Sequence, residues 1–371
     1  MNVWLANPRG FCAGVERAVK MVDELLAVSQ APVYVRHEIV HNRSVVDGLR
    51  TRGAVFVDEV AQIPAGALAV VSAHGAPPQV FSDASRRHLR LFDATCPLVS
   101  KVHFEVIAHS LAGHAVLLIG HRGHVEVDGT LGQYTNPAGG GIQVVQDEDE
   151  ARLVSVPDPS TVAYVTQTTL ANDTVKRVVA VLRQRFPALQ GPHHADICYA
   201  TQNRQDAVRL LCRHSELVLV IGAPHSSNSL RMVEVAQEAG VPARLIENAD
   251  DLDPAWLDGI ENLGLSASAS APEALVTATV ARLRQWRPGL QVHALGLPED
   301  MVFKLPSALV ALRDQTPAGP QSPGAVAGSA AHPAAHPAAH PAAYPSAYPS
   351  AKVAAKPATN AASIDPTGAH P

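Results

Sequence analysis

Apolar and polar blocks alternate along most of the chain, and the first blocks set a plan that recurs. Residues 1–6 form a short apolar run with the composition of a buried strand. The turn-forming residues of 7–14 follow. From Val15 onward apolar residues recur on one helical face, and Glu16 stands in the first turn, where the helix dipole favours a carboxylate. The pattern predicts a strand, a tight corner and a helix.

The same order of elements recurs twice, and each corner holds one cysteine. A thiol beside a helix N-terminus is stabilised as a thiolate, which is the form that attacks or binds metal. Pro97 suits the first position of the second helix. The three corners contain Cys12, Cys96 and Cys198, and the helices after them are expected from Val15 onward, over 98–111 and over 203–212.

Each of these helices leads to a strand and then to polar loops. The distance from a cysteine to its first polar loop is nearly constant, at 29, 28 and 30 residues, for the pairs Cys12 and His41, Cys96 and His124, and Cys198 and Asn228. A second polar loop follows in each unit, at 72–75, 166–169 and 268–270. The chain therefore reads as three copies of one plan, although any short α/β unit of this length gives part of that regularity.

Strands alternating with helices predict an α/β fold of three pseudo-symmetric domains with mostly parallel sheets. Ligands bind such sheets beyond the carboxyl ends of the strands, where all the polar loops lie. Further strands are expected at 32–35, 54–57, 68–71, 115–119, 162–165, 217–221 and 263–265, with helices at 44–49, 230–237 and 271–286. We predict domains at 13–96, 97–194 and 195–285, with residues 1–12 adding a strand to the third and 286–314 packing on the core.

Residues 315–371 differ from the rest of the chain. His-Pro and Tyr-Pro pairs recur every four residues between 332 and 349, within Ala and Ser. Proline at this frequency prevents helix formation, and few apolar side chains remain to be buried. We predict a disordered tail that serves as a linker, with weak metal binding by its histidines as the alternative.

Composition excludes several classes of function. The net charge of −5 argues against general nucleic-acid binding, and no run approaches the roughly 20 apolar residues that span a bilayer. Asn7, Pro8 and Arg9 interrupt the first apolar run, so we expect no signal peptide and a cytoplasmic protein with reduced cysteines. No Walker loop, G-x-G-x-x-G or C-x-x-C motif occurs, so nothing indicates NAD, FAD or a zinc ribbon.

Three lone cysteines on three units suggest one shared metal centre. Soft thiolate ligands favour zinc or an iron–sulfur cluster. Three ligands on a four-iron cluster would leave one iron open to a substrate oxygen, as in open zinc sites. The alternative is three reduced cysteines that merely fill corners, because free cysteine is often buried. Cys212 lies within a helix near apolar residues and is expected in the core.

The polar loops predict an anion site. His41, His74 and His124 end strands at matching places, so a shared pocket is expected. With Ser226, Asn228, Ser270 and Thr168 they form a ring of neutral or weakly cationic donors suited to a phosphate or diphosphate. Glu126 is the one carboxylate that this pattern places among the loops. It shares a face with His124 if the segment is extended, and it serves as an acid if burial raises its pKa. A solvated loop glutamate is the alternative.

Taken together, these motifs closely resemble the IspH (LytB) family of 4-hydroxy-3-methylbut-2-enyl diphosphate reductases. The resemblance covers residues 1–310 in order and leaves out the tail. It rests on NPRGFCAG at 7–14, VHN at 40–42, SAHG at 72–75, DATCP at 93–97, GHRGHVE at 120–126, TQTT at 166–169, DICYATQNR at 196–204 and SSNS at 226–229.

The resemblance implies three α/β domains around a central cavity. It implies that Cys12, Cys96 and Cys198 hold one 4Fe–4S cluster with one open iron. Thr168 and Glu126 match residues near the substrate hydroxyl, with Glu126 in the proton relay. The positions that match the diphosphate-binding residues are His41, His74, His124, Ser226, Ser227, Asn228 and Ser270.

The implied reaction is reductive removal of the substrate's hydroxyl in the non-mevalonate (MEP) pathway of isoprene biosynthesis. It gives isopentenyl and dimethylallyl diphosphates, with single electrons supplied by ferredoxin or flavodoxin. Ser268 stands where the family pattern has glycine, and His225 where it has asparagine. Two other functions stay open: a zinc-dependent hydrolase using His124, Glu126 and a cysteine, and a non-catalytic diphosphate-binding protein.

Overall fold

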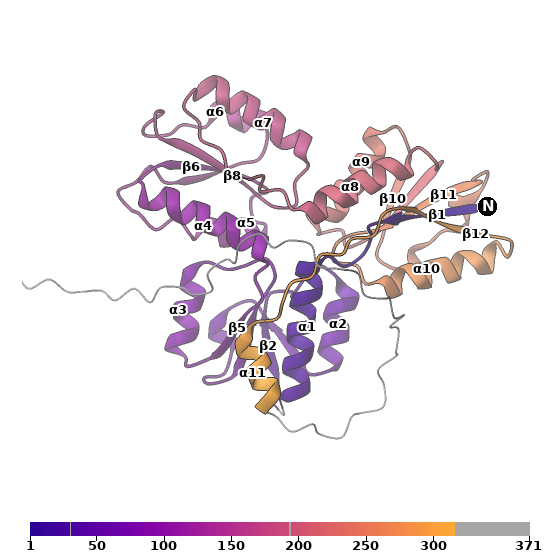
Figure 1. Cartoon of the computed structure of the whole chain (residues 1–371), viewed down its shortest axis with the longest axis horizontal. Coiled ribbons are helices and arrows are strands. Elements are labelled where there is room, and N and C mark those ends of the chain that lie inside the picture. The colour runs from indigo at the N-terminus through magenta and orange to yellow at the C-terminus, as the bar shows by residue number, and fades with distance from the viewer. Residues whose placement is uncertain (30, 193, 316–371) are drawn as a thin grey trace, which may run out of the picture. The chain divides into compact units, whose positions relative to one another are not determined.

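The computed structural model describes residues 1–29, 31–192 and 194–315, and these residues form three parallel β-sheets with their helices (Figure 1). The α/β fold class with parallel sheets is confirmed. The predicted tail, from residue 316 onward, lies outside the described residues, and the domain boundaries stay a prediction.

Each sheet is formed mainly by strands that are close in sequence, and every strand pairing within the sheets is parallel. The first sheet has the order β3-β2-β4-β5, with β2 Val33–Arg36, β3 Ala54–Val57, β4 Leu68–Val71 and β5 Arg90–Asp93. The second has the order β7-β6-β8, with β6 Ala115–Ile119, β7 Ile142–Val145 and β8 Val162–Thr166. The third has the order β10-β9-β11-β1-β12, with β1 Asn2–Asn7, β9 Leu217–Ile221, β10 Ala243–Ile246, β11 Asn262–Ala267 and β12 Gln291–Gly296.

Helices connect the strands, as parallel pairing requires. They are α1 Ala13–Val28, α2 Arg43–Thr51, α3 Pro78–Arg86, α4 Pro97–Leu111, α5 Val125–Leu131, α6 Glu148–Leu153, α7 Asn172–Arg185, α8 Tyr199–Leu211, α9 Ser227–Glu238, α10 Glu273–Trp286 and α11 Ser307–Gln315. Short 3-10 helices occur at Val60–Gln62, Ala249–Asp251 and Pro254–Leu257. Within the described residues, none of the helices is both long enough and apolar enough to cross a bilayer.

The chain passes from one sheet to the next at each of the three cysteines. Cys12 separates β1 of the third sheet from α1, whose apolar face packs on the first sheet. Cys96 separates β5 of the first sheet from α4, which packs on the second. Cys198 precedes α8, which packs on the third sheet beside Ala6 of β1. The three crossings therefore link the sheets in a closed cycle.

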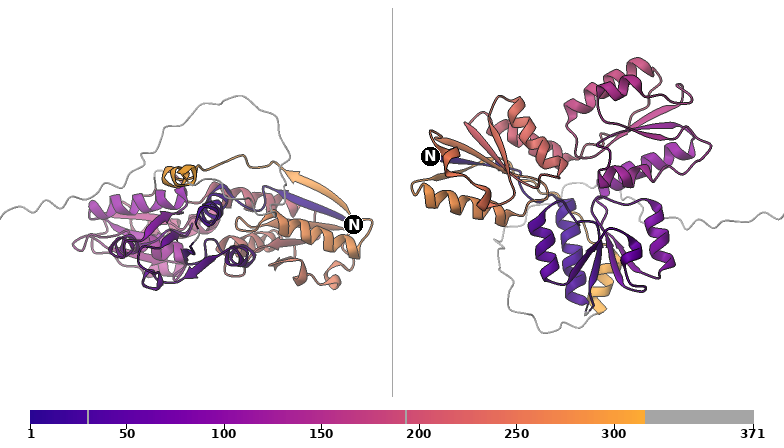
Figure 2. Two further views of the ribbon diagram at one scale, coloured as in Figure 1. Left: turned by 90° about the horizontal axis from the view of Figure 1, so that it is seen from below. Right: turned by 180° about the vertical axis from the view of Figure 1, so that it is seen from behind.

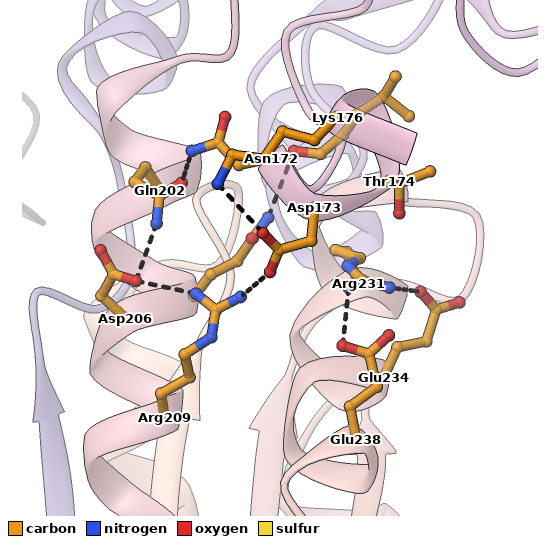
Figure 3. A network of polar contacts seen from close by, with 12 residues as sticks. Asn172, Asp173, Thr174, Lys176, Gln202, Asp206, Arg209, Arg231, Glu234 and Glu238 are labelled. Atoms are coloured by element: carbon orange, nitrogen blue, oxygen red, sulfur yellow. Dashed lines mark hydrogen bonds and ion pairs between the residues drawn. The ribbon is translucent and has the colours of Figure 1, made fainter. Parts of the chain in front are cut away.

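Polar contacts also connect the second and third sheets through their helices (Figure 3). The side-chain amide of Asn172 at the start of α7 donates to Gln202 of α8. Arg209 of α8 lies 3.5 Å from a carboxylate oxygen of Asp173 and 2.8 Å from one of Asp206. Asp173 and Asp206 are exposed and Arg209 is partly exposed, so these ion pairs contribute little to stability.

The C-terminal part of the described chain returns to the first sheet. β12 pairs with β1 at the edge of the third sheet, and α11 then packs its buried Leu309 into the core beneath α1 (Figures 1 and 2). The sequence pattern did not predict β12, because none of its residues is fully buried and only Val292, His293 and Leu295 are partly buried.

The extended geometry in which His124 and Glu126 would share a face does not occur. Residues after His124 are helical rather than extended, and His124 is the N-cap of α5. The Nδ1 atom of His124 accepts a hydrogen bond from the Glu126 backbone N–H at 3.1 Å. A helix of only seven residues with a glycine at position 129 gives a weak periodic signal, which is why the pattern missed it.

Candidate functional site

One pocket is lined by residues from all three sheets. It lies at the carboxyl ends of the strands, as expected for parallel α/β sheets. All twelve candidate site residues line it: Cys12, Cys96, Cys198, His41, His74, His124, Glu126, Thr168, Ser226, Ser227, Asn228 and Ser270. The structure thus brings together all the predicted site residues, although the first and last of them, Cys12 and Ser270, are 258 positions apart in the chain.

The three cysteines occupy equivalent positions. Each is the N-cap of a helix: α1, α4 and α8. Each backbone N–H also donates to a carbonyl in the second polar loop of a neighbouring strand. The distances are 3.2 Å from Cys12 to Ala269, 3.0 Å from Cys96 to Ala73 and 2.9 Å from Cys198 to Thr168. One repeated backbone contact therefore directs all three thiols toward the same pocket.

The thiol groups fit a soft metal centre. A Cβ atom at Gly14 would lie 2.7 Å from the Sγ of Cys96 and 3.9 Å from the Sγ of Cys12, so both sulfurs approach one point. Burial raises the pKa of the Cys96 thiol to about 12 and that of Cys198 to about 11, and the neighbouring cysteines add to both shifts. Cys96 and Cys198 therefore resist ionisation while no metal is bound, and a bound metal removes that cost by neutralising their thiolates.

The three histidines form one cluster. The ring of His41 stacks on that of His74 at 4.1 Å between centroids, and His124 meets His41 edge-on at 5.3 Å. Burial lowers the pKa of His124 to about 4 and that of His74 well below its usual value, and the neighbouring histidines lower both further. Both rings are therefore neutral. Since Nδ1 of His124 accepts a hydrogen bond, its proton is on Nε2 and can be donated to a ligand.

Glu38 is a functional candidate that the sequence pattern missed. Its Oε2 atom lies 3.2 Å from Nδ1 of His41 and 2.9 Å from Nε2 of His225. These contacts, led by that of His41, lower the pKa of the Glu38 carboxyl. Nε2 of His41 is buried without a partner among the described residues, so it is available to a ligand. The sequence feature that could have identified Glu38 is its position just after the end of β2, where the other site residues also follow strands.

Glu126 and Thr168 form a buried pair. The Thr168 backbone N–H donates to Oε1 of Glu126 at 2.6 Å, and the Thr168 hydroxyl donates to Oε2 at 2.9 Å. Burial raises the pKa of Glu126 to about 7, and the two bonds from Thr168 oppose that shift. The solvated-loop alternative is therefore wrong, since the side chain is almost fully buried.

The remaining polar candidates lie around the start of α9 and the loop after β11. The Ser226 hydroxyl caps α9 by accepting from the Ser229 backbone N–H. Oδ1 of Asn228 is buried without a partner among the described residues. The Ser270 hydroxyl donates to the His41 carbonyl at 2.9 Å and lies 3.3 Å from the hydroxyl of Ser268. Ser268 therefore adds a hydroxyl beside Ser270 without displacing it from the pocket.

These groups combine three chemical capacities in one pocket. The thiols are soft ligands for a metal centre. The neutral imidazole of His124 and the serine hydroxyls can donate hydrogen bonds to an anion. The Glu126 carboxyl is a group that exchanges a proton near neutral pH.

Comparisons with known proteins agree with this geometry. The family model described as LytB protein matches residues 3–284. A protein of Xanthomonas oryzae pv. oryzae (strain PXO99A) named 4-hydroxy-3-methylbut-2-enyl diphosphate reductase is 53% identical over 310 residues, covering 83% of this chain and 98% of the relative. The protein of the same name from Xanthomonas campestris pv. campestris (strain B100) has the same identity and coverage.

Two solved structures are also similar. That of the E-1-hydroxy-2-methyl-but-2-enyl-4-diphosphate reductase from Plasmodium falciparum superposes with a TM-score of 0.79 at 35% identity, covering 84% of this chain and 98% of that chain. A structure of (E)-4-hydroxy-3-methyl-but-2-enyl diphosphate reductase, described as the terminal enzyme of the non-mevalonate pathway, gives a TM-score of 0.58 at 32% identity, covering 76% and 99%. On the extent of these matches, the chain is a member of the LytB family.

Proposed function

We propose that this protein is a 4-hydroxy-3-methylbut-2-enyl diphosphate reductase, an oxidoreductase that catalyses the last step of the non-mevalonate pathway. The observation that carries the proposal is the convergence of three N-cap cysteines, a histidine cluster and the Glu126–Thr168 pair on one pocket. The relatives that bear this name align along nearly their whole length. They lend no support to the zinc hydrolase or the non-catalytic binding protein.

Cys12, Cys96 and Cys198 are the residues that would hold the metal centre, a 4Fe–4S cluster with three cysteine ligands and one open iron. When bound, such a cluster supplies electrons and a Lewis acid for the substrate oxygen. The chain fits it because three thiols, and no fourth cysteine, line the pocket. Ferredoxin or flavodoxin is the proposed electron donor, and the cytoplasm the proposed compartment.

The histidine cluster and the loops at α9 and β11 would bind the diphosphate. Nε2 of His124 carries a proton that it can donate to a phosphate oxygen, because Nδ1 of the same ring accepts a hydrogen bond. Nε2 of His41 is buried and lacks a partner among the described residues, which indicates that a ligand completes its hydrogen bonding. Holding the allyl group in a reactive orientation in this way can contribute about 7–11 kcal/mol to catalysis.

Glu126 would supply the proton. Its raised pKa keeps a large fraction of the carboxyl protonated at neutral pH. In the overall reaction one C–O bond breaks and one C–H bond forms, two electrons and two protons are consumed, and the hydroxyl leaves as water. Thr168 donates two hydrogen bonds to Glu126 and so holds it beside the pocket, where its proton can reach the leaving oxygen.

The direct test is the visible spectrum of protein purified without oxygen, with iron and sulfide assayed on the same sample. We expect a brown protein with about four irons and four sulfides per chain, and reduction of the allylic diphosphate by a one-electron donor. A protein that stays colourless after anaerobic reconstitution, or that binds one zinc instead, would refute the proposal.

A further inference from the structure

Arg17 joins the first cysteine's helix to the second cysteine's loop. It stands on α1, five residues after Cys12. Its Nη1 donates to the carbonyls of Ala94 and Thr95, the two residues before Cys96, at 3.3 and 3.2 Å. Because Cys12 caps the same helix, one rigid element holds both the first thiol and the loop that carries the second.

Lys101 repeats this arrangement one step further along the chain. It stands on α4, five residues after Cys96. Its Nζ donates to the carbonyls of His194 and Ala195 at 2.6 and 3.3 Å, and to Asp196 at 2.9 Å. These residues lead directly into Cys198, so α4 connects the second thiol to the third.

Arg204 closes the cycle. It stands on α8, six residues after Cys198, and its side chain is almost completely buried. Its guanidinium donates to the carbonyls of Gly10, at 2.8 Å, and Phe11, at 3.2 Å, which are the two residues before Cys12. A third bond goes to Glu299, which lies beyond β12.

We propose that Arg17, Lys101 and Arg204 are positioning residues for the metal centre, each fixing the loop of the next cysteine so that the three thiolates are held ready in a closed ring. This inference rests on the proposed function, since it concerns the same three cysteines. It goes further in naming three cations outside the ligand set as the groups that set the spacing of the ligands.

Charge-assisted hydrogen bonds to consecutive carbonyls are stronger than neutral ones, so the three cations fix the backbone of the loops that carry the cysteines. Rigid support of this kind, acting through groups that do not touch the metal, raises metal affinity by reducing the ordering needed on binding.

The test uses the full chain, freed of iron and kept without oxygen, titrated with Cd²⁺ and followed by the ultraviolet absorption of cadmium–thiolate bonds. Arg17→Met and Lys101→Met remove the cation from partly buried sites, while Arg17→Lys and Lys101→Arg keep the charge. Lys20→Met, at an exposed position one turn further on α1, is the matched control. Thermal melting of each variant shows whether the fold is retained.

We expect about tenfold weaker Cd²⁺ binding for each Met variant, parent-like binding for the Lys20 control, and recovery in the charge-keeping variants. In each single Met variant the two remaining cations still link all three loops, whereas in the double variant they do not. Combining the two Met substitutions should therefore weaken Cd²⁺ binding by more than the product of the single effects. The positioning role is refuted if the Met variants melt like the parent and also bind Cd²⁺ like the parent. It is also refuted if the parent does not bind one Cd²⁺ through thiolates. If Cd²⁺ binding follows these expectations but no iron–sulfur cluster assembles on the parent protein, the proposed function is refuted and the positioning role of the cations is not.

Discussion

Replacing Glu126 with glutamine isolates the proton that this site is expected to deliver. The substitution keeps the shape of the side chain and both contacts with Thr168. The amide oxygen can still accept from the Thr168 backbone N–H, and the amide NH₂ can donate to the Thr168 hydroxyl, which then acts as acceptor. Only the titratable proton and the charge are removed, so changes in pH dependence report on that proton.

The structure gives the size of the effect on stability. Burial raises the pKa of Glu126 from its ordinary value of 4.5 to about 7. A group whose pKa is raised in the folded state stabilises the protein fully below the unfolded pKa, and this contribution is lost as the pH rises through the folded pKa. The linkage relation gives a cost of about 1 kcal/mol at pH 5 and about 3 kcal/mol at pH 8. The parent should therefore lose roughly 2 kcal/mol of stability relative to the glutamine variant over this interval.

The assay compares urea unfolding of parent and Glu126→Gln at pH 5, 6, 7 and 8, without oxygen and at matched iron content. Glu261→Gln, at an exposed position before β11, controls for the change in net charge. We also expect kcat of the parent to fall above pH about 7, and kcat of Glu126→Gln to fall at least about 100-fold with little change in KM. Equal pH dependence of stability in parent and variant would refute the buried proton, and near-normal turnover in the variant would remove Glu126 from the proton path.

Two further substitutions test the geometry of the pocket. Gly14→Ala should reduce the iron content per chain to less than half, because its Cβ would lie 2.7 Å from the Sγ of Cys96. In the control Gly48→Ala the added Cβ meets nothing within 4 Å, so the iron content should not change. Equal iron content in the two variants would contradict the predicted crowding. Glu38→Gln should raise KM for the diphosphate about tenfold at nearly constant kcat, because it weakens a charge-assisted bond that orients His41. Steady-state kinetics would check this, and an unchanged KM would show that His41 needs no such support.

The sequence predicted the buried strands well. The bounds expected at 54–57, 68–71, 115–119 and 217–221 agree with β3, β4, β6 and β9. Three of these four strands are completely buried, so their apolar runs are uninterrupted and are bounded by glycine, proline or polar residues. Half-exposed elements such as β12 and the short helix α5 gave no comparable signal.

The site residues that could be predicted from the sequence are those of rare types in unusual places. Lone cysteines and histidines near strand ends are rare enough to stand out, and the three predicted ligand cysteines and His41, His74 and His124 all line one pocket. Glu38 was missed because glutamate is common on protein surfaces, and nothing in its immediate sequence shows that it meets His225, which lies 187 residues further on.

The sequence by itself determined the order of strands and helices and the placement of a cysteine at each corner, because hydrophobic periodicity and turn residues act over a few neighbouring positions. The tertiary structure alone decided that each cysteine stands where the chain crosses to another sheet, and that Arg17, Lys101 and Arg204 each reach the loop of the next cysteine. Those contacts join residues 77 to 194 positions apart. They exist only after the three sheets have packed, because no local pattern records which loop a long cation will meet.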